Sequence, residues 1–195
     1  TKSFIATPRG VTLPELLLVV AILVAMGSQV IPQLQSADAS RLELAVSEVT
    51  AALRYARDES VRSGAVHSVE LDVAAEIVRV VRYADFDVLA MPPPVVFHPL
   101  SRQPYQYDLD SLASTAPTQV ASVELNYDAV TAPDRIDFSA QGLPHYIRPG
   151  GTRHRLLDGR IGLALGGFEM GITLDPLTGR ITPDASPTTI VVVGP

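Results

Sequence analysis

Hydrophobic residues are unevenly distributed along this chain, and the densest run lies near its start. Leu16 to Met26 is almost entirely apolar, and with its flanks the segment from Val11 to Ile31 covers 21 residues. As an α-helix this segment would be roughly 31 Å long, which matches the hydrocarbon core of a membrane. The short start, residues 1–10, has Lys2 and Arg9 as its charges, so the positive-inside rule keeps it in the cytoplasm. We therefore predict a single-pass transmembrane helix over residues 11–31.

A helical pattern with a different distribution of polar residues follows. Pro32 either ends one helix or kinks a longer one, and the immediate return of helical periodicity favours a kink. Apolar residues then recur at the i, i+3, i+4 spacing of one buried stripe: Leu42, Ala45, Val46, Val49, Ala52, Leu53 and Ala56. We predict an amphipathic helix over residues 32–63 that ends at Gly64.

From residue 64 onward the period changes to the alternation of β-strands. Strand patterns occupy Val66–Val73, Ile77–Val81, Val120–Tyr127, Arg135–Ser139, Ile161–Leu165, Phe168–Leu174, Arg180–Thr182 and Thr188–Val193. Six prolines between Pro92 and Pro117 predict an inserted surface loop over residues 90–118. Residues 64–195 are thus expected to form an antiparallel β domain. The predicted fold class is α+β, with the long N-terminal helix packed on one face of the sheet.

Composition removes several kinds of chemistry. The chain has no cysteine, which excludes disulfides and thiolate metal sites and leaves the redox compartment open. Its four histidines lie far apart, and His67, in a strand, is expected to be half-buried or exposed. Asp108-Leu109-Asp110-Ser111 resembles the start of a calcium loop but lacks the glycine and the closing glutamate. No Gly-x-Ser-x-Gly motif occurs. We predict no cofactor, no metal and no enzymatic activity.

One carboxylate stands just inside the apolar segment. Placing Glu15 in lipid costs on the order of 2.5–3.5 kcal/mol, so this acid requires a function. An ordinary secretory signal peptide also has a basic start and an apolar stretch, but it has no use for such an acid. Its small-x-small cleavage site is also missing here, with Ala25-Met26-Gly27 as the best approximation.

The residues Gly10-Val11-Thr12-Leu13-Pro14-Glu15-Leu16-Leu17 resemble the type IV prepilin signature. The resemblance implies that prepilin peptidase cuts between Gly10 and Val11 and N-methylates Val11, where the family usually has Phe. It also implies a role for Glu15 in assembly. Within the fibre its carboxylate would pair with the freed amine of a neighbouring subunit, because a buried unpaired charge is strongly unfavourable.

A second resemblance lies further along the predicted helix. The segment from Ala52 to Gly64, Ala-Leu-Arg-Tyr-Ala-Arg-Asp-Glu-Ser-Val-Arg-Ser-Gly, is similar to the helix end of the GspH/FimT pseudopilin family. It implies a pilin-like fold and a minor pseudopilin of a type II secretion system or a type IV pilus, located near the fibre tip. The implied partners are other pilins, the assembly platform and prepilin peptidase. The implied location is the bacterial inner membrane, with a periplasmic globular domain. Which machine the subunit serves stays open.

Charge is distributed asymmetrically in the predicted β domain. Residues 145–160 carry four arginines and one acid, a net charge of 4 − 1 = +3, whereas residues 65–137 carry 4 bases and 11 acids, or −7. Some FimT-type pilins bind DNA through Gly-Arg-x-Arg, but Gly179-Arg180-Ile181-Thr182 lacks the second arginine. A DNA-binding pilin for natural transformation, a solvated turn and an interface to an acidic neighbour stay open. The candidate contacts are Arg148, Arg153, Arg155, Arg160 and Arg180.

Overall fold

The chain divides into two compact units, residues 1–37 and residues 38–195. Helix α1, Leu13–Ser63, begins in the first unit and ends in the second. The computed structural model describes residues 13–83, 96–110, 118–131, 134–148 and 151–190, with only the backbone of residues 24–36. The predicted leader, together with Gly10 and Val11, lies outside these ranges.

The part of α1 that belongs to the second unit has one fully buried face. The predicted stripe is confirmed, because its members are at most 1% exposed: Leu42, Ala45, Val46, Val49, Ala52, Leu53 and Ala56. The helix ends at Ser63 as predicted. Gly64 takes the left-handed conformation at φ +72, and its N–H donates to the carbonyl oxygen of Ser60 at 2.9 Å. This bond satisfies a carbonyl that the helix end would otherwise leave unpaired.

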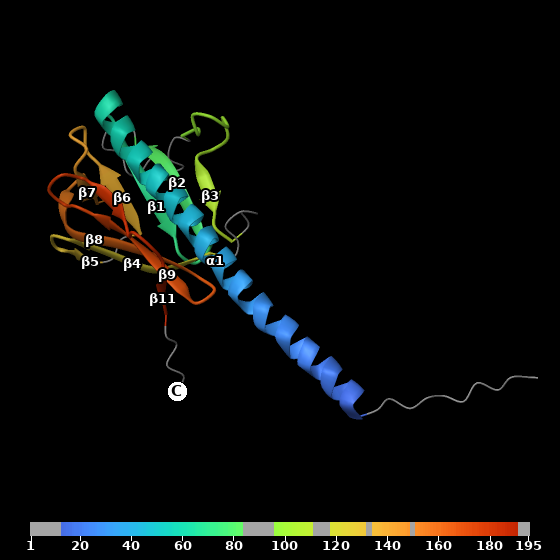
Figure 1. Ribbon diagram of the computed structural model, residues 1–195. Coiled ribbons are helices and arrows are strands. Elements are labelled where there is room, and N and C mark those ends of the chain that lie inside the picture. Colours follow the sequence, from blue (N-terminus) through green and yellow to red (C-terminus); the bar gives the residue numbers. More distant parts are fainter. Residues whose placement is uncertain (1–12, 84–95, 111–117, 132–133, 149–150, 191–195) are drawn as a thin grey trace, which may run out of the picture. The chain divides into compact units, whose positions relative to one another are not determined.

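The sheet is antiparallel in every pair of strands that the structure describes, and its central order is β10-β9-β8-β7-β6-β1-β2-β3 (Figure 1). Its strands are β1 (Val66–Asp72), β2 (Ile77–Tyr83), β3 (Gln106–Asp108), β4 (Gln119–Tyr127), β5 (Val130–Thr131), β6 (Arg135–Phe138), β7 (Pro144–Ile147), β8 (Arg153–Leu165), β9 (Phe168–Leu174), β10 (Ile181–Pro183) and β11 (Thr188–Thr189). Strand β4 pairs with β8 and β5, and β11 pairs with β9.

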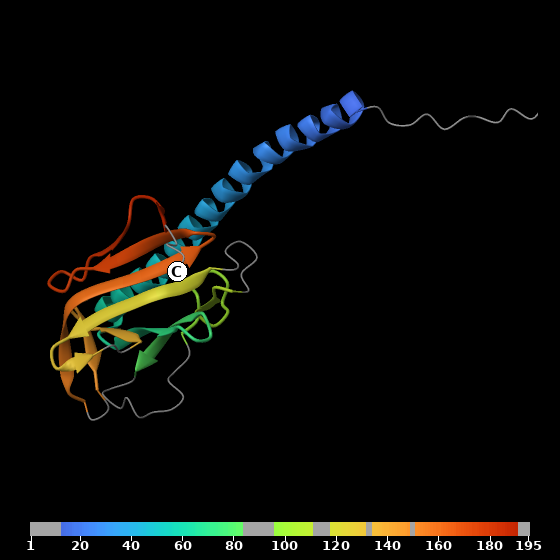
Figure 2. The same cartoon turned by 90° about the horizontal axis from the view of Figure 1, so that it is seen from below.

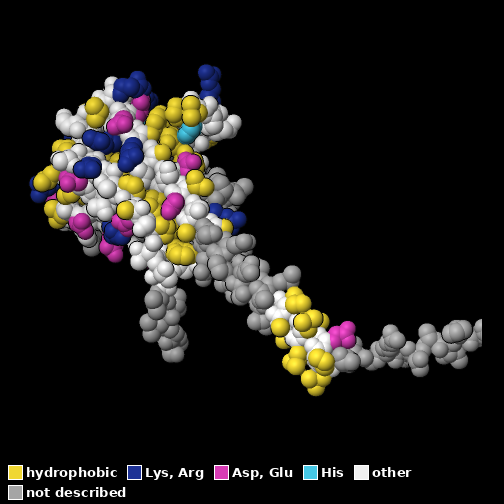
Figure 3. Space-filling model, viewed as in Figure 1, with side chains coloured by type: hydrophobic (Ala, Val, Ile, Leu, Met, Phe, Trp, Pro, Cys, Tyr) yellow, Lys and Arg dark blue, Asp and Glu magenta, His cyan; other side chains and the backbone are white. Residues whose placement is uncertain are grey.

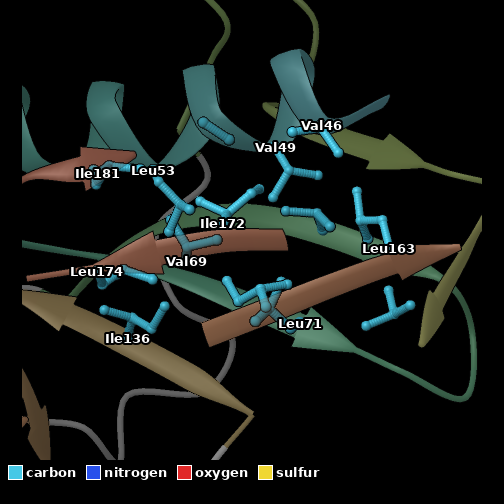
Figure 4. Close-up of a cluster of buried hydrophobic side chains, with 14 of the residues drawn as sticks. Val46, Val49, Leu53, Val69, Leu71, Ile136, Leu163, Ile172, Leu174 and Ile181 are labelled. Carbon is cyan, nitrogen blue, oxygen red and sulfur yellow. The ribbon is translucent and has the colours of Figure 1, made fainter. Parts of the chain in front are cut away.

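Strand β8 joins the two halves of this sheet. Its first residues pair with β7, whereas the remainder lies between β4 and β9. The sheet is therefore curled, as Figure 2 shows. Side chains from both halves converge under the helix, among them Val69 and Leu71 of β1, and Leu163 and Ile172 of β8 and β9 (Figure 4). One helix stripe thus forms a common core with most of the curled sheet, while Val81, Tyr83 and Ile147 form a separate small cluster.

The predicted class, a helix with an antiparallel sheet, is confirmed, and several details need correction. Strand β8 is longer than the predicted Ile161–Leu165, and β7 was missed because it begins with Pro144, a residue type that is rare inside strands. His67 is 2% exposed, so the predicted exposure was wrong: its backbone N–H donates to the hydroxyl of Ser60 near the helix end, and its Nδ1 atom lies 3.1 Å from the carbonyl oxygen of Ala65.

The proline-rich segment also differs from the prediction. It contributes β3 to the sheet, and both Tyr105 and Leu109 are buried in the core at 4% and 0% exposure. The prediction of a surface loop is therefore wrong for residues 105–109, whereas residues 99–104 are exposed as predicted. Residues 84–95 and 111–117 lie outside the described ranges. The error arose because the many prolines predicted a loop, although a few apolar residues anchor the segment in the core.

Candidate functional site

The start of α1 is apolar on all sides. In Figure 3 its described side chains are hydrophobic, beside one acidic group. Large apolar side chains between 47% and 74% exposed occur at Leu13, Leu16, Leu17, Leu18, Val19, Val20, Ile22 and Leu23. A helix that is hydrophobic around its whole circumference is normally buried in a protein core or in a membrane. Burial of this segment therefore requires an apolar environment beyond its own unit.

Glu15 lies in the first turn of this helix and is exposed. Backbone N–H groups without partners give a helix start partial positive charge, so a carboxylate is favourable there. Pro14 also occupies the first turn, where its missing N–H removes no helical hydrogen bond. Helix α1 is drawn through Pro32, and the kink predicted at this proline stays a prediction.

Within the described part of the chain, no helix has both the length and the hydropathy needed to span a membrane. The span predicted over residues 11–31 includes positions whose side chains lie outside the described set. It stays a prediction.

The predicted basic residues do not form a single site. Arg160 contacts the carboxylate of Asp184 at 2.8 Å, and Asp184 also accepts the N–H of Gly171. Arg180 is exposed in the turn before β10, and Arg148 is exposed after β7. The structure brings together only Arg153 and Arg155 among these five residues, at the start of β8, where they line the same groove.

This groove, called here the Leu177 groove, has a volume of about 420 Å³. It lies between the β6–β7 turn, the start of β8 and the β9–β10 turn, and its lining is Asp128, Ser139, Gln141, Leu143, Pro144, His145, Arg153, Arg155, Pro176 and Leu177. The β6–β7 and β9–β10 turns abut, because a Cβ atom at Gly179 would collide with the carbonyl oxygen of Gly142. Its walls combine apolar side chains with two arginines, the composition typical of a binding surface.

A buried ion pair lies on the part of the sheet formed by β1, β2, β6 and β7. The Nε atom of Arg135 is 2.8 Å from Oδ1 of Asp137, whose side chain is fully buried. Asp137 also accepts hydrogen bonds from the hydroxyl of Ser68 at 2.6 Å and from the N–H of Ile147 at 2.6 Å. Arg135 in turn donates to the carbonyl oxygen of Ile147 at 2.6 Å. Three strands are thereby connected through one carboxylate.

Aromatic rings complete this network. The guanidinium of Arg135 lies 4.7 Å from the ring centre of Tyr83 and 4.9 Å from that of Tyr146. Burial alone would lower the pKa of Arg135, but the charge of Asp137 offsets it and the pKa is raised. Burial raises the pKa of Tyr83, and its hydrogen bond to Glu70 raises it further. The Arg135 guanidinium is therefore charged at neutral pH, and its contacts with Asp137, Ile147 and the two rings indicate a structural role.

The histidines form no metal site. Among the described residues, no three His, Asp or Glu side chains converge as metal ligands would. Burial lowers the pKa of His67 and of His145. Leu109 is fully buried between the two acids that resembled a calcium loop, so this segment is part of the core.

Comparison with known proteins gives likenesses of fold. No family model matches the chain, and no curated protein matches it. The minor pseudopilin EpsH from the type 2 secretion system of Vibrio cholerae superposes with a TM-score of 0.48 at 11% identity, covering 74% of this chain and 97% of that one. The Pseudomonas aeruginosa type IV minor pilin FimU superposes with a TM-score of 0.45 at 15% identity, covering 78% and 96%. The functional proposal below rests on this chain's own residues.

Proposed function

We propose that this chain is a minor pilin-like subunit, a pseudopilin, that is processed between Gly10 and Val11 and built into a short fibre. The fibre would belong to a type II secretion system or a type IV pilus. The chain would act as a structural subunit near the fibre tip, without catalysis. Before assembly its globular unit would lie in the periplasm, anchored in the inner membrane by the start of α1.

One observation carries the proposal: an acid stands in the first turn of α1, where the large side chains from Leu13 to Leu23 are apolar and exposed. Glu15 is the single charged residue between Val11 and Ile31. The apolar surface around it would be buried by lipid in the membrane and by neighbouring helices in a fibre. In both settings the carboxylate is unfavourable unless a cation meets it. The amine freed at Val11 of a neighbouring subunit is such a cation.

The arrangement of the arginines in the globular unit gives little support to DNA binding. Arg160 is paired with Asp184, and the remaining arginines are divided between the Leu177 groove and two separate turns. Phosphate binding through several arginines would fall steeply with salt. We expect the purified protein to bind duplex DNA weakly. A submicromolar, salt-sensitive affinity that is lost on Arg153→Ala and Arg155→Ala would replace the structural role with DNA capture.

The assembly mechanism is tested by Glu15→Gln, which keeps the shape of the side chain and removes its charge. We expect membrane insertion to be unchanged or improved, while cross-linking to partner pseudopilins in membranes is reduced. Glu43→Gln is the matched control, because Glu43 is an exposed acid further along the same helix. A Glu15→Gln variant that cross-links like the parent would contradict the charge-pair mechanism. For this conclusion the cross-links must also show that another subunit lies above this one in the fibre.

A further inference from the structure

Three arginines lie close together at the end of α1 and are called here the Arg57 patch: Arg54 and Arg57 of the helix, and Arg180 of the turn before β10. Arg54 donates from Nη2 to the carbonyl oxygen of Ile181 at 3.2 Å, directly after Arg180 in the chain. A Cβ atom at Gly179 would lie 3.4 Å from Nε of Arg57, so Arg57 reaches the residue before Arg180. Figure 3 shows basic side chains gathered over the C-terminal end of α1 and the adjoining sheet.

Arg57 is held by the two turns that abut beside the helix. A Cβ atom at Gly142 would lie 3.2 Å from its Nε and 3.4 Å from its Cγ, so the side chain packs on the backbone of the β6–β7 turn as well. Within the described ranges Arg57 forms no hydrogen bond and no ion pair, and its Nε is buried without a partner. A guanidinium carries five N–H donors and a permanent charge. The position of Arg57 is therefore fixed, while its charge is not compensated inside the described part of the chain.

The acids around the patch leave it positive. Asp58 is exposed, and although it stands four residues after Arg54, the two form no ion pair among the described residues. The carboxylate of Glu59 is bonded to Arg62 at 2.8 Å. Oδ1 of Asp175 accepts two backbone N–H groups of its own turn at 2.9 and 2.8 Å. The three arginines against Asp58 and Asp175 give 3 − 2 = +1, on a chain whose net charge is −6.

Apolar side chains beside the arginines favour a protein as the partner over a nucleic acid. Val61 is 52% exposed, and its Cγ2 would lie 3.1 Å from a Cβ atom at Gly142, so it borders Arg57. Leu177 is 72% exposed in the same turn as Arg180. Arginine beside accessible apolar surface is typical of protein–protein interfaces. A phosphate backbone would gain nothing from these apolar side chains and would be repelled by the two acids.

We propose that the Arg57 patch binds a carboxylate-rich segment of another protein. The planar guanidinium matches a carboxylate in two parallel hydrogen bonds, which a phosphate-free acidic peptide can supply repeatedly. Apolar side chains of the same partner would cover Val61 and Leu177. The patch lies wholly in residues 38–195, so the inference does not depend on processing at Gly10 or on the charge of Glu15.

A labelled polyglutamate peptide tests the patch by fluorescence anisotropy, with the full-length protein in a non-ionic detergent at low salt. We expect saturable binding that weakens as salt is added, because salt screens exposed charges. Arg54→Gln and Arg180→Gln should each lower the affinity about threefold to tenfold, since each removes one charge-assisted contact. A neutral glycine-serine peptide of equal length should not bind. Absence of saturable polyglutamate binding, or equal binding of the neutral peptide, would overturn the proposal.

Arg62→Gln is the matched control, because Arg62 is an exposed arginine on the same helix that is already bonded to Glu59. It should change the affinity by less than about twofold. An equal loss in Arg62→Gln would show that only net charge matters, and the patch would be rejected. Arg57→Gln should abolish most of the binding while the circular dichroism spectrum stays native. If this variant unfolds, the exposed Arg54 and Arg180 variants decide the outcome.

Duplex DNA, measured under the same conditions, is the competing ligand. We expect it to bind more weakly than the peptide. If DNA binds more tightly and loses affinity in the Arg54→Gln and Arg180→Gln variants, the patch is a nucleic-acid site and the proposal is wrong. Glu15→Gln should leave peptide binding unchanged, which separates this result from that of the fibre proposal.

Discussion

Two stretches of the same helix have similar apolar residues and opposite exposure. From Leu13 to Leu23 the large apolar side chains are 47–74% exposed, whereas the stripe from Leu42 to Ala56 is at most 1% exposed. The stripe is completed by the sheet of its own unit. The first stretch is apolar on all sides and has no such partner among the described residues. From this comparison we expect the stripe to stabilise the fold, and the helix start to serve contacts outside the folded unit, as proposed above.

The largest effect on stability is expected from the buried carboxylate of Asp137. Asp137→Ala leaves Arg135 buried without its counter-ion, and we expect a loss of about 3–5 kcal/mol in the free energy of unfolding. Urea denaturation followed by circular dichroism measures it. Asp134→Ala is the control, because Asp134 is exposed next to the same strand. Equal effects of the two substitutions would show that the ion pair does not support the fold.

The stripe itself gives the second prediction. Leu53→Ala removes a fully buried side chain and should cost about 2–5 kcal/mol. Leu44→Ala changes the same residue type on the same helix where it is 51% exposed, and should cost less than about 0.5 kcal/mol. If the two variants unfold at the same urea concentration, the stripe is not the part of α1 that stabilises the globular unit.

Acidity should weaken the globular unit by a smaller amount. The pKa values of His67 and His145 are lowered by burial from an ordinary value of 6.5. Below pH 6.5 the unfolded chain therefore binds protons that the folded chain does not, so stability is complete above this pH and falls as the pH decreases. Denaturation at pH 7.5 and 5.5 measures the difference. A His67→Gln, His145→Gln double variant should show a smaller difference, and an unchanged one would exclude these two groups.

The smallest effect on stability is expected from removing the helix start altogether. Deleting residues 1–35 should leave a soluble, β-rich protein whose unfolding free energy agrees with that of the full chain within about 0.5 kcal/mol. The stripe remains with its sheet, so the core is intact. A fragment that is unfolded by circular dichroism would show that the helix start contributes to the fold, and the contrast between the two stretches would fail.

The sequence predicts those features that depend on neighbours along the chain. The helix stripe, the stop at Gly64 and most strands follow from local periodicity and are confirmed. The ion pair was missed because burial of Arg135 and Asp137 depends on strands far apart in sequence. Their i, i+2 spacing in a predicted strand, which places both side chains on one face, was the available signal.

The candidate sites show the same limit. Counting arginines between residues 145 and 160 named Arg153 and Arg155 as candidates without showing that they line one groove, and it could not show that Arg160 is paired with Asp184. The groove also depends on the contact between two turns at Gly142 and Gly179. No local sequence pattern predicts this contact. Long-range packing decides which charges remain available at a surface.

The most direct test of the central claim is the intact mass of the protein extracted from native membranes. The account predicts a chain that begins at N-methylated Val11. Gly10→Val should block this processing more strongly than Gly10→Ala, because the peptidase requires a small residue before the cut. A mature chain that retains residues 1–10, or one that begins near Gly27, would contradict the proposal that this protein is a pilin-like subunit.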